Sequence, residues 1–272
     1  MSPEVGQLDE DAVERALSDD PDAVLGLLAD LTSATDSALR ELARRLAGRL
    51  VVDLARRGAP RQRGVGRLRL QPFDDSGNDL DIDASIEGLV NGQGRVGVDL
   101  DALRARGWAK PGTAWSLLVD RSGSMGGERL SAAALAAAAV AWRSPSDYSV
   151  LAFAADVVVV KSQDAAKPPE RVVNELLALR GHGTTDLALA LRAASDQLQR
   201  SRAGRRLVVL LSDCRATVAG DVAGAARHLD ELVIVPPADD ATDAEELARS
   251  VGARCLPLAG ASAFPALIAQ LV

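Results

Sequence analysis

The most constraining feature of the sequence is a regular alternation of short apolar runs and amphipathic segments from residue 114 onward. The run 207–211 is continuously apolar, which is typical of a parallel strand covered on both faces of its sheet. Parallel strands need crossover helices, so this order predicts a doubly wound α/β sheet. The predicted strands are 115–120, 148–154, 157–161, 206–211, 231–235 and 254–258. The predicted helices are 127–142, 169–179, 186–199, 221–228, 243–251 and 263–272.

One connection breaks this pattern. Only Ala155 and Asp156 separate two predicted strands. Two residues cannot form a crossover, so the strand 157–161 must pair antiparallel with its predecessor at an edge of the sheet. The sequence therefore predicts a mostly parallel sheet of six strands with one antiparallel edge strand, preceded by an N-terminal helical region.

The residues before this domain divide into two regions. Residues 1–60 are expected to be helical, with a short helix at 11–17, a second capped by Asp20 through residue 31, and a third to about residue 57. That third helix carries an apolar stripe, formed by Leu39, Leu42, Leu46, Leu50 and Leu54.

Residues 61–112 are expected to connect these helices to the main domain, 113–272. They contain an alternating strand at 66–73, an acidic loop at 74–83, a short helix at 84–90 capped by Asp83, and a second at 99–106. The acidic loop lacks the glycine and closing glutamate of an EF-hand, which favours a solvated turn or a docking loop over a metal site.

Composition excludes several classes of function. A net charge of −7 disfavours nucleic-acid binding, and 3% aromatic residues leave few platforms for stacking bases. The arginine-rich segment 56–69 is interpreted as a solvated connector, with an acidic partner or RNA as alternatives. Two cysteines, no signal peptide and no long apolar segment predict a cytoplasmic protein that does not span a membrane.

Three predicted loops should meet beyond the carboxyl ends of the strands, where open α/β sheets bind ligands. They contain two carboxylates and several hydroxyls, which are hard oxygen ligands that suit Mg²⁺, or Mn²⁺ or Ca²⁺, better than zinc. A simpler alternative is that Asp120 and Ser122 cap the following helix. The candidate metal ligands are Asp120, Ser122, Ser124, Thr185 and Asp213.

Three further residues are candidates for the rim of this site. His182 and Thr184 precede Thr185, and Cys214 follows Asp213. No serine or cysteine nucleophile stands near His182 in sequence, so we interpret it as a rim residue rather than a catalytic base. Cys214 is interpreted as a small buried residue. The sequence thus indicates binding rather than catalysis.

These motifs resemble the von Willebrand factor A domain with its metal-ion-dependent adhesion site, over about residues 113–272. Asp120, Ser122 and Ser124 match its Asp-x-Ser-x-Ser motif, Thr185 its metal-binding threonine, and Asp213 its third motif. Thr184 is the alternative register for the threonine. The third motif usually reads Thr-Asp-Gly, whereas this chain has serine and cysteine around Asp213. The resemblance implies a Mg²⁺ site that binds an acidic residue of a partner.

The arrangement of a helical region, an arginine-rich strand and an A domain is similar to the CoxE-like class of bacterial proteins. That resemblance implies a non-enzymatic adaptor or co-chaperone of a MoxR-type AAA+ ATPase, contacting the ATPase or its client. The chain has no Gly-x-x-x-x-Gly-Lys-[Ser/Thr] motif and so does not resemble the ATPase itself. The alternatives are a magnesium or cobalt chelatase-type subunit, a metal-dependent phosphohydrolase, and an RNA-binding A-domain protein.

Overall fold

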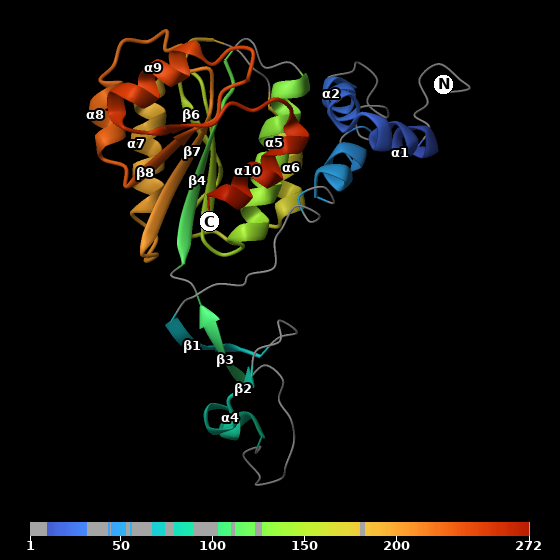
Figure 1. Ribbon diagram of the computed structural model, residues 1–272, viewed down its shortest axis with the longest axis vertical. Coiled ribbons are helices and arrows are strands. Elements are labelled where there is room, and N and C mark those ends of the chain that lie inside the picture. The colour runs from blue at the N-terminus through green and yellow to red at the C-terminus, as the bar shows by residue number, and fades with distance from the viewer. Residues whose placement is uncertain are drawn as a thin grey trace. The chain divides into compact units, whose positions relative to one another are not determined.

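The computed structural model describes residues 10–31, 43, 45–52, 55, 67–73, 79–89, 103–109, 112–122, 127–179 and 183–271. The chain forms two compact units (Figure 1). One unit consists of residues 1–60 together with 113–272, and the other of residues 61–112. The Leu39, Leu42 and Leu54 positions of the predicted apolar stripe lie outside the described residues.

The large unit is built on a six-stranded sheet with the order β6-β5-β4-β7-β8-β9. All neighbouring pairs are parallel except β5 and β6, which are antiparallel. The predicted fold class, including the antiparallel edge strand, is therefore confirmed. The strands are β4 (Thr113–Asp120), β5 (Tyr148–Phe153), β6 (Val157–Lys161), β7 (Arg205–Leu211), β8 (Glu231–Ile234) and β9 (Arg254–Cys255).

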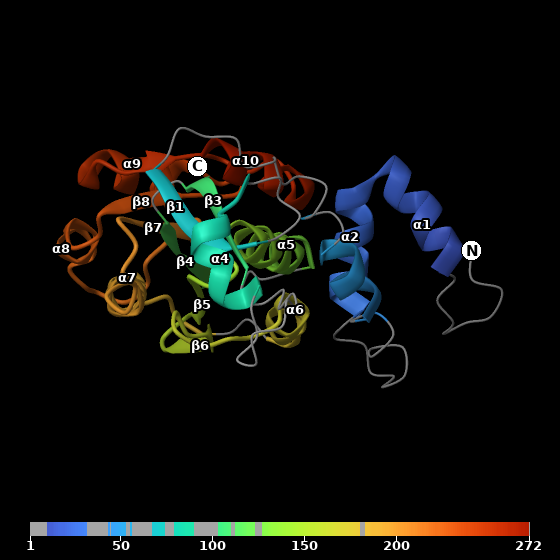
Figure 2. The ribbon, with the colours of Figure 1, turned by 90° about the horizontal axis from the view of Figure 1, so that it is seen from below.

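Helices cover both faces of this sheet (Figure 2). Side chains alternate along β4, so that Leu117 joins the core under one set of helices and Leu118 the core under the other. The first set is α5 (Gly127–Arg143), α6 (Pro169–Ala178) and α10 (Phe264–Gln270), which follows a 3₁₀ turn at Ala261–Ala263. The second set is α7 (Leu187–Leu198), α8 (Val222–Arg227) and α9 (Thr242–Val251).

Helix α5 is central because it is enclosed on all sides. Every residue from Ala133 to Ala141 is at most 3% exposed. A helix that is apolar all round belongs in a core, and its many alanines allow neighbouring helices to approach closely. This burial fixes the first turn of α5, which faces the carboxyl end of β4.

The N-terminal helices α1 (Glu10–Asp19) and α2 (Pro21–Leu31) extend this core. The predicted cap of α2 is present, since the Ala23 amide donates to Asp20 Oδ1 at 3.0 Å. Leu25 and Leu28 are each 1% exposed and belong to the same apolar cluster as α5. Residues 45–52 are also helical and contribute Leu46 to that cluster. The N-terminal region therefore shares its core with the sheet domain.

The small unit contains a second sheet with the order β1-β3-β2. Its elements are β1 (Arg67–Pro72), β2 (Asp79–Leu80), α4 (Ile82–Leu89) and β3 (Arg104–Ala109). The helix predicted over 99–106 is wrong at 104–106, where the chain forms β3 instead. Strand β3 pairs antiparallel with β1 over six residues, and this long-range pairing overrides local helical propensity.

The cap of α4 also differs from the prediction. Asp81, and not Asp83, accepts a hydrogen bond from the Ala84 amide at 3.0 Å. The side chain of Arg106 on β3 bonds the same carboxylate. The Ala84 hydrogen bond, with a further contribution from Arg106, lowers the pKa of Asp81. Asp81 therefore joins the helix to the sheet.

Candidate metal centre and its pocket

Two buried carboxylates lie at the carboxyl end of the central strands. Asp120 is the last residue of β4, and Asp213 follows β7 by two residues. The two strands are parallel neighbours, with Val119 opposite Leu211, so both acids emerge at the same edge. Asp120 is 7% exposed and Asp213 is 8% exposed. Buried acids need hydrogen-bond donors or cations nearby.

The Asp120 carboxylate is fixed by two donors. Its Oδ1 accepts from the Ser122 amide at 2.8 Å, and its Oδ2 accepts from the Ser212 hydroxyl at 2.6 Å. The Ser212 Oγ also accepts from the Cys214 amide at 2.9 Å. Ser212 therefore connects the loop after β7 to the end of β4, a role that its position beside Asp213 in sequence does not reveal.

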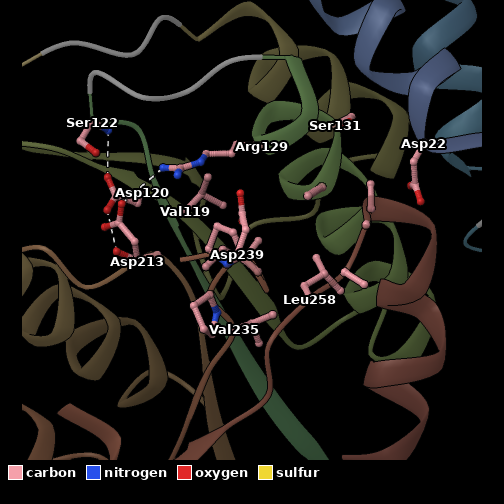
Figure 3. A pocket seen from close by; sticks show the side chains of 18 residues that line it. Asp22, Val119, Asp120, Ser122, Arg129, Ser131, Asp213, Val235, Asp239 and Leu258 are labelled. Carbon is pink, nitrogen blue, oxygen red and sulfur yellow. Dashed lines mark hydrogen bonds and ion pairs between the residues drawn. The ribbon is translucent and has the colours of Figure 1, made fainter. Parts of the chain in front are cut away.

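Asp213 is held by its own loop and by a cation from α5. Its Oδ1 accepts from the Arg215 amide at 3.1 Å, and its Oδ2 lies 3.4 Å from Arg129 Nη1. Figure 3 shows the Arg129 side chain directed toward Asp213. Arg129 Nη2 also lies 3.8 Å from Asp240 Oδ2, so the guanidinium is near two acids. Arg129 is not among the residues that the sequence motifs indicated. Its position in the sequence could have indicated it, because Arg129 lies in the first turn of α5. The helix dipole disfavours a positive charge there unless nearby acids compensate for it.

A pocket of about 210 Å³ opens beside these acids. Its polar end contains Asp120, Asp213 and Arg129, and its wall is largely apolar, as Figure 3 shows for Val119 and Leu258. Asp239 is an exposed acid among the lining residues. The remaining lining residues are Asp22, Ser122, Ser131, Ala132, Leu211, Ser212, Val235, Pro236, Pro237, Ala259, Gly260 and Ala261.

Asp22 brings the N-terminal helix α2 to this pocket. Its carboxylate accepts from the Ser262 amide at 2.7 Å and from the Ser262 hydroxyl at 2.8 Å. A Cβ at Gly260 would lie 2.2 Å from Asp22 Oδ2, so the close approach requires glycine. One wall of the pocket is therefore tied to a helix 240 residues away in sequence.

Thr185 lies on a neighbouring loop and is 3% exposed, but it does not line the pocket. Its amide donates to Thr217 Oγ1 at 2.7 Å. Gly183 has a φ of 85°, a conformation that favours glycine, and Asp186 caps α7 by accepting from the Leu189 amide at 2.9 Å. Thr184 is exposed. The structure thus joins Asp120, Ser122 and Asp213 around one pocket, whereas Thr185 is buried and does not belong to its lining.

Cys214 is buried and has the positive φ that the loop after Asp213 requires. Its φ is 64°, the left-handed region that favours glycine, and it is 8% exposed. Burial, followed by the nearby charges of Asp213 and Asp120, raises the pKa of the Cys214 thiol. Cys214 is therefore a buried neutral thiol beside the site. Two other candidates, Ser124 and His182, lie outside the described residues.

The chemistry of these donors fits a hard cation. The described residues contain no group of three or more histidine, cysteine, aspartate or glutamate side chains that could hold a metal by themselves. Any cation at this edge would rest on two carboxylates and neutral hydroxyls. Such oxygen donors suit Mg²⁺, Mn²⁺ or Ca²⁺ and do not suit a zinc site of histidine and cysteine.

Comparison with known proteins supports a von Willebrand factor type A domain within the chain. Residues 116–215, which include Asp120, Thr185 and Asp213, match the family model for that domain. A comparison with curated protein sequences gave no match. In the described part of the chain, no helix has the length and apolar character needed to cross a bilayer.

Several solved structures are similar to the chain at low sequence identity. Proximal thread matrix protein 1 from the mussel byssus is 12% identical, with a TM-score of 0.48 over 58% of this chain and 46% of that protein. An aerotolerance-related membrane protein from Bacteroides fragilis is 15% identical, with a TM-score of 0.48 over 58% and 98%. A von Willebrand factor type A protein from Catenulispora acidiphila is 16% identical, with a TM-score of 0.47 over 61% and 43%. The chain thus spans less than half of the first and the third.

Proposed function

We propose that the sheet domain is a metal-dependent protein-interaction module that binds an acidic residue of a partner. The observation that carries this proposal is the pair of buried carboxylates, Asp120 and Asp213, at the polar end of a pocket. A general interaction role is supported by the von Willebrand factor type A match. The proposed cation is Mg²⁺, with Mn²⁺ or Ca²⁺ as alternatives, held by Asp120, Ser122, Ser124, Thr185 and Asp213.

The hydrogen bonds around Asp120 support a role in cation binding. The Ser122 amide and the Ser212 hydroxyl hold both oxygens in place before any ligand arrives. Preorganised donors of this kind orient a metal ligand and tune its affinity. When bound, the cation supplies residual positive charge that attracts a carboxylate from another molecule.

The size of the pocket supports a partner side chain as the occupant. Its volume of about 210 Å³ is below the ~300–1,000 Å³ that is usual for small-molecule and cofactor sites. Its apolar wall, which includes Val119, Val235 and Leu258, suits an aliphatic group next to the acidic one. These features favour recognition of a protein segment.

We further propose a MoxR-type AAA+ ATPase, or its client, as the partner, with the chain acting as a cytoplasmic adaptor or co-chaperone. This step is supported by the resemblance in sequence organisation. It assigns the energy-using step to the ATPase and leaves recognition to this chain. The alternatives are a chelatase-type subunit, a metal-dependent phosphohydrolase and an RNA-binding protein.

The test begins with Mn²⁺, which can be titrated into the metal-free protein and followed by electron paramagnetic resonance. Asp120→Asn and Asp213→Asn should lose Mn²⁺ binding, because each removes a carboxylate while keeping the side-chain volume. Asp196→Asn removes one exposed carboxylate from α7 and should bind like wild type. A wild-type protein that binds no Mn²⁺ would contradict the proposal.

The partner is tested by co-expressing a MoxR-type ATPase with each variant and purifying the chain in Mg²⁺ or in EDTA. The ATPase should copurify with wild type and Asp196→Asn in Mg²⁺ only. Copurification with Asp120→Asn at the wild-type level in saturating Mg²⁺ would exclude metal-mediated contact. Metal-dependent phosphoester hydrolysis by the isolated chain would instead favour an enzyme. Salt-sensitive RNA binding unaffected by Asp120→Asn would favour the RNA-binding class.

A further inference from the structure

The β5–β6 turn, residues 154–156, is bonded to the segment that carries Asp120. The amide of the following residue, Arg121, donates to the Phe153 carbonyl at the end of β5 at 2.8 Å. The Arg121 guanidinium also bonds the carboxylate of Asp156, which lies in the turn itself. The side chain of Arg121 is 7% exposed, whereas that of Asp156 is 69% exposed. A buried charge that loses its counter-charge is strongly unfavourable, so this ion pair holds the turn against the end of β4.

The same turn is bonded to the segment that carries Thr185. The amide of the following residue, Asp186, donates to the Ala154 carbonyl at 2.8 Å. The Thr185 carbonyl in turn accepts from the amides of Thr217 and Val218 at 3.1 and 3.2 Å. Thr185 is therefore held between the β5–β6 turn and the loop that follows β7.

We propose that Asp156 is a positioning residue: through the β5–β6 turn it sets the separation between Asp120 and Thr185 at a shared cation. This inference rests on the proposed function. Because the turn contacts both segments, a change in its position moves one candidate ligand relative to the other. Asp156 does not line the pocket, so it acts on a cation only through its neighbours. Outer partners of metal ligands typically change metal affinity by ~10–100-fold.

The experiment measures Mn²⁺ affinity by electron paramagnetic resonance in two variants of Asp156. Asp156→Asn removes the charge that holds Arg121 and should bind Mn²⁺ about tenfold more weakly, at the lower end of the range for outer partners. Asp156→Glu keeps the carboxylate and should stay within about threefold of wild type. Asp164→Asn is the matched control, because the Asp164 side chain is 62% exposed and pairs with Arg200 away from the pocket lining. This control should bind Mn²⁺ like wild type.

A double-mutant cycle separates positioning from a simple loss of negative charge. Thr185→Ala removes the hydroxyl that the turn positions and should itself weaken Mn²⁺ binding. Asp120 remains oriented by the Ser122 amide and the Ser212 hydroxyl in every variant. Adding Asp156→Asn to Thr185→Ala should therefore weaken binding by less than about twofold further. A long-range effect of charge would instead be additive, so a further loss of about tenfold in the double variant overturns the proposal.

The two proposals fail in different ways. A wild-type protein without Mn²⁺ binding contradicts the proposed function. Normal Mn²⁺ binding by wild type, together with wild-type affinity in Asp156→Asn or in Thr185→Ala, overturns the role of Asp156 alone. Failure of Asp156→Glu to recover binding also overturns it. Thermal melts in EDTA establish that each variant is folded before its affinity is compared.

Discussion

Removing the hydroxyl of Ser212 should destabilise the sheet domain, even without metal. Ser212 is 5% exposed, donates to Asp120 at 2.6 Å and accepts from the Cys214 amide at 2.9 Å. A hydrogen bond to a charged group contributes ~1.5–3 kcal/mol, and an orphaned buried amide costs ~1–3 kcal/mol. Water can reach the site through the pocket, so we expect Ser212→Ala to lower the free energy of unfolding by about 2.5 kcal/mol, the lower end of the combined range.

The assay is urea denaturation in EDTA, with two control variants. Ser212→Thr keeps the hydroxyl and should cost less than about 1 kcal/mol. Ser250→Ala removes an exposed serine that donates to the Leu247 carbonyl at 2.8 Å, and should cost less than about 0.5 kcal/mol. If Ser212→Ala unfolds within 0.5 kcal/mol of wild type, or Ser212→Thr is equally damaging, the reasoning about the shared hydroxyl is refuted.

Three further predictions concern the core, the pH dependence and the thiol. Leu28→Ala should lower the unfolding free energy by about 3 kcal/mol, whereas Leu27→Ala, at a 60% exposed position of the same helix, should change it by less than about 0.5 kcal/mol in urea denaturation. Arg205 bonds Glu231 at 2.6 and 2.7 Å and lowers its pKa. Because the pKa of Glu231 is lower in the folded state, the ionised side chain contributes stability that is fully present above the unfolded pKa of 4.5. This stability is lost as the pH falls through the pKa of the folded state, so Glu231→Gln should approach wild-type stability below pH 4.5. Cys214, whose pKa burial raises, should resist iodoacetamide at about pH 8 in native protein and react once unfolded, as peptide mass spectrometry can show.

Much of the sheet could be predicted because its local signals agree with its tertiary structure. The apolar run in β7 is buried on both faces of the sheet, as a central parallel strand requires. The two-residue link before β6 left only antiparallel pairing, which the structure shows. The positions of Asp120 and Asp213 followed from the same argument, because adjacent parallel strands end at one edge.

The small unit was predicted less well because its elements depend on distant partners. Residues 104–106 carry no local signal strong enough to distinguish a helix from a strand, and pairing with β1 decides the outcome. Asp81 and Asp83 are both plausible caps in sequence. Only Asp81 can accept from the Ala84 amide while also bonding Arg106 on β3. Tertiary contacts therefore set both features.

The same limit explains why the surroundings of the candidate site were missed. Arg129 meets Asp213 across 84 residues, and Asp22 meets Ser262 across 240 residues. No periodicity or motif connects such pairs, whereas the motif around Asp120 is local and visible. These distant residues give the pocket its charge and its wall. The local motif thus predicts which oxygen atoms the site offers, whereas the charge and the wall of the pocket around them depend on long-range contacts.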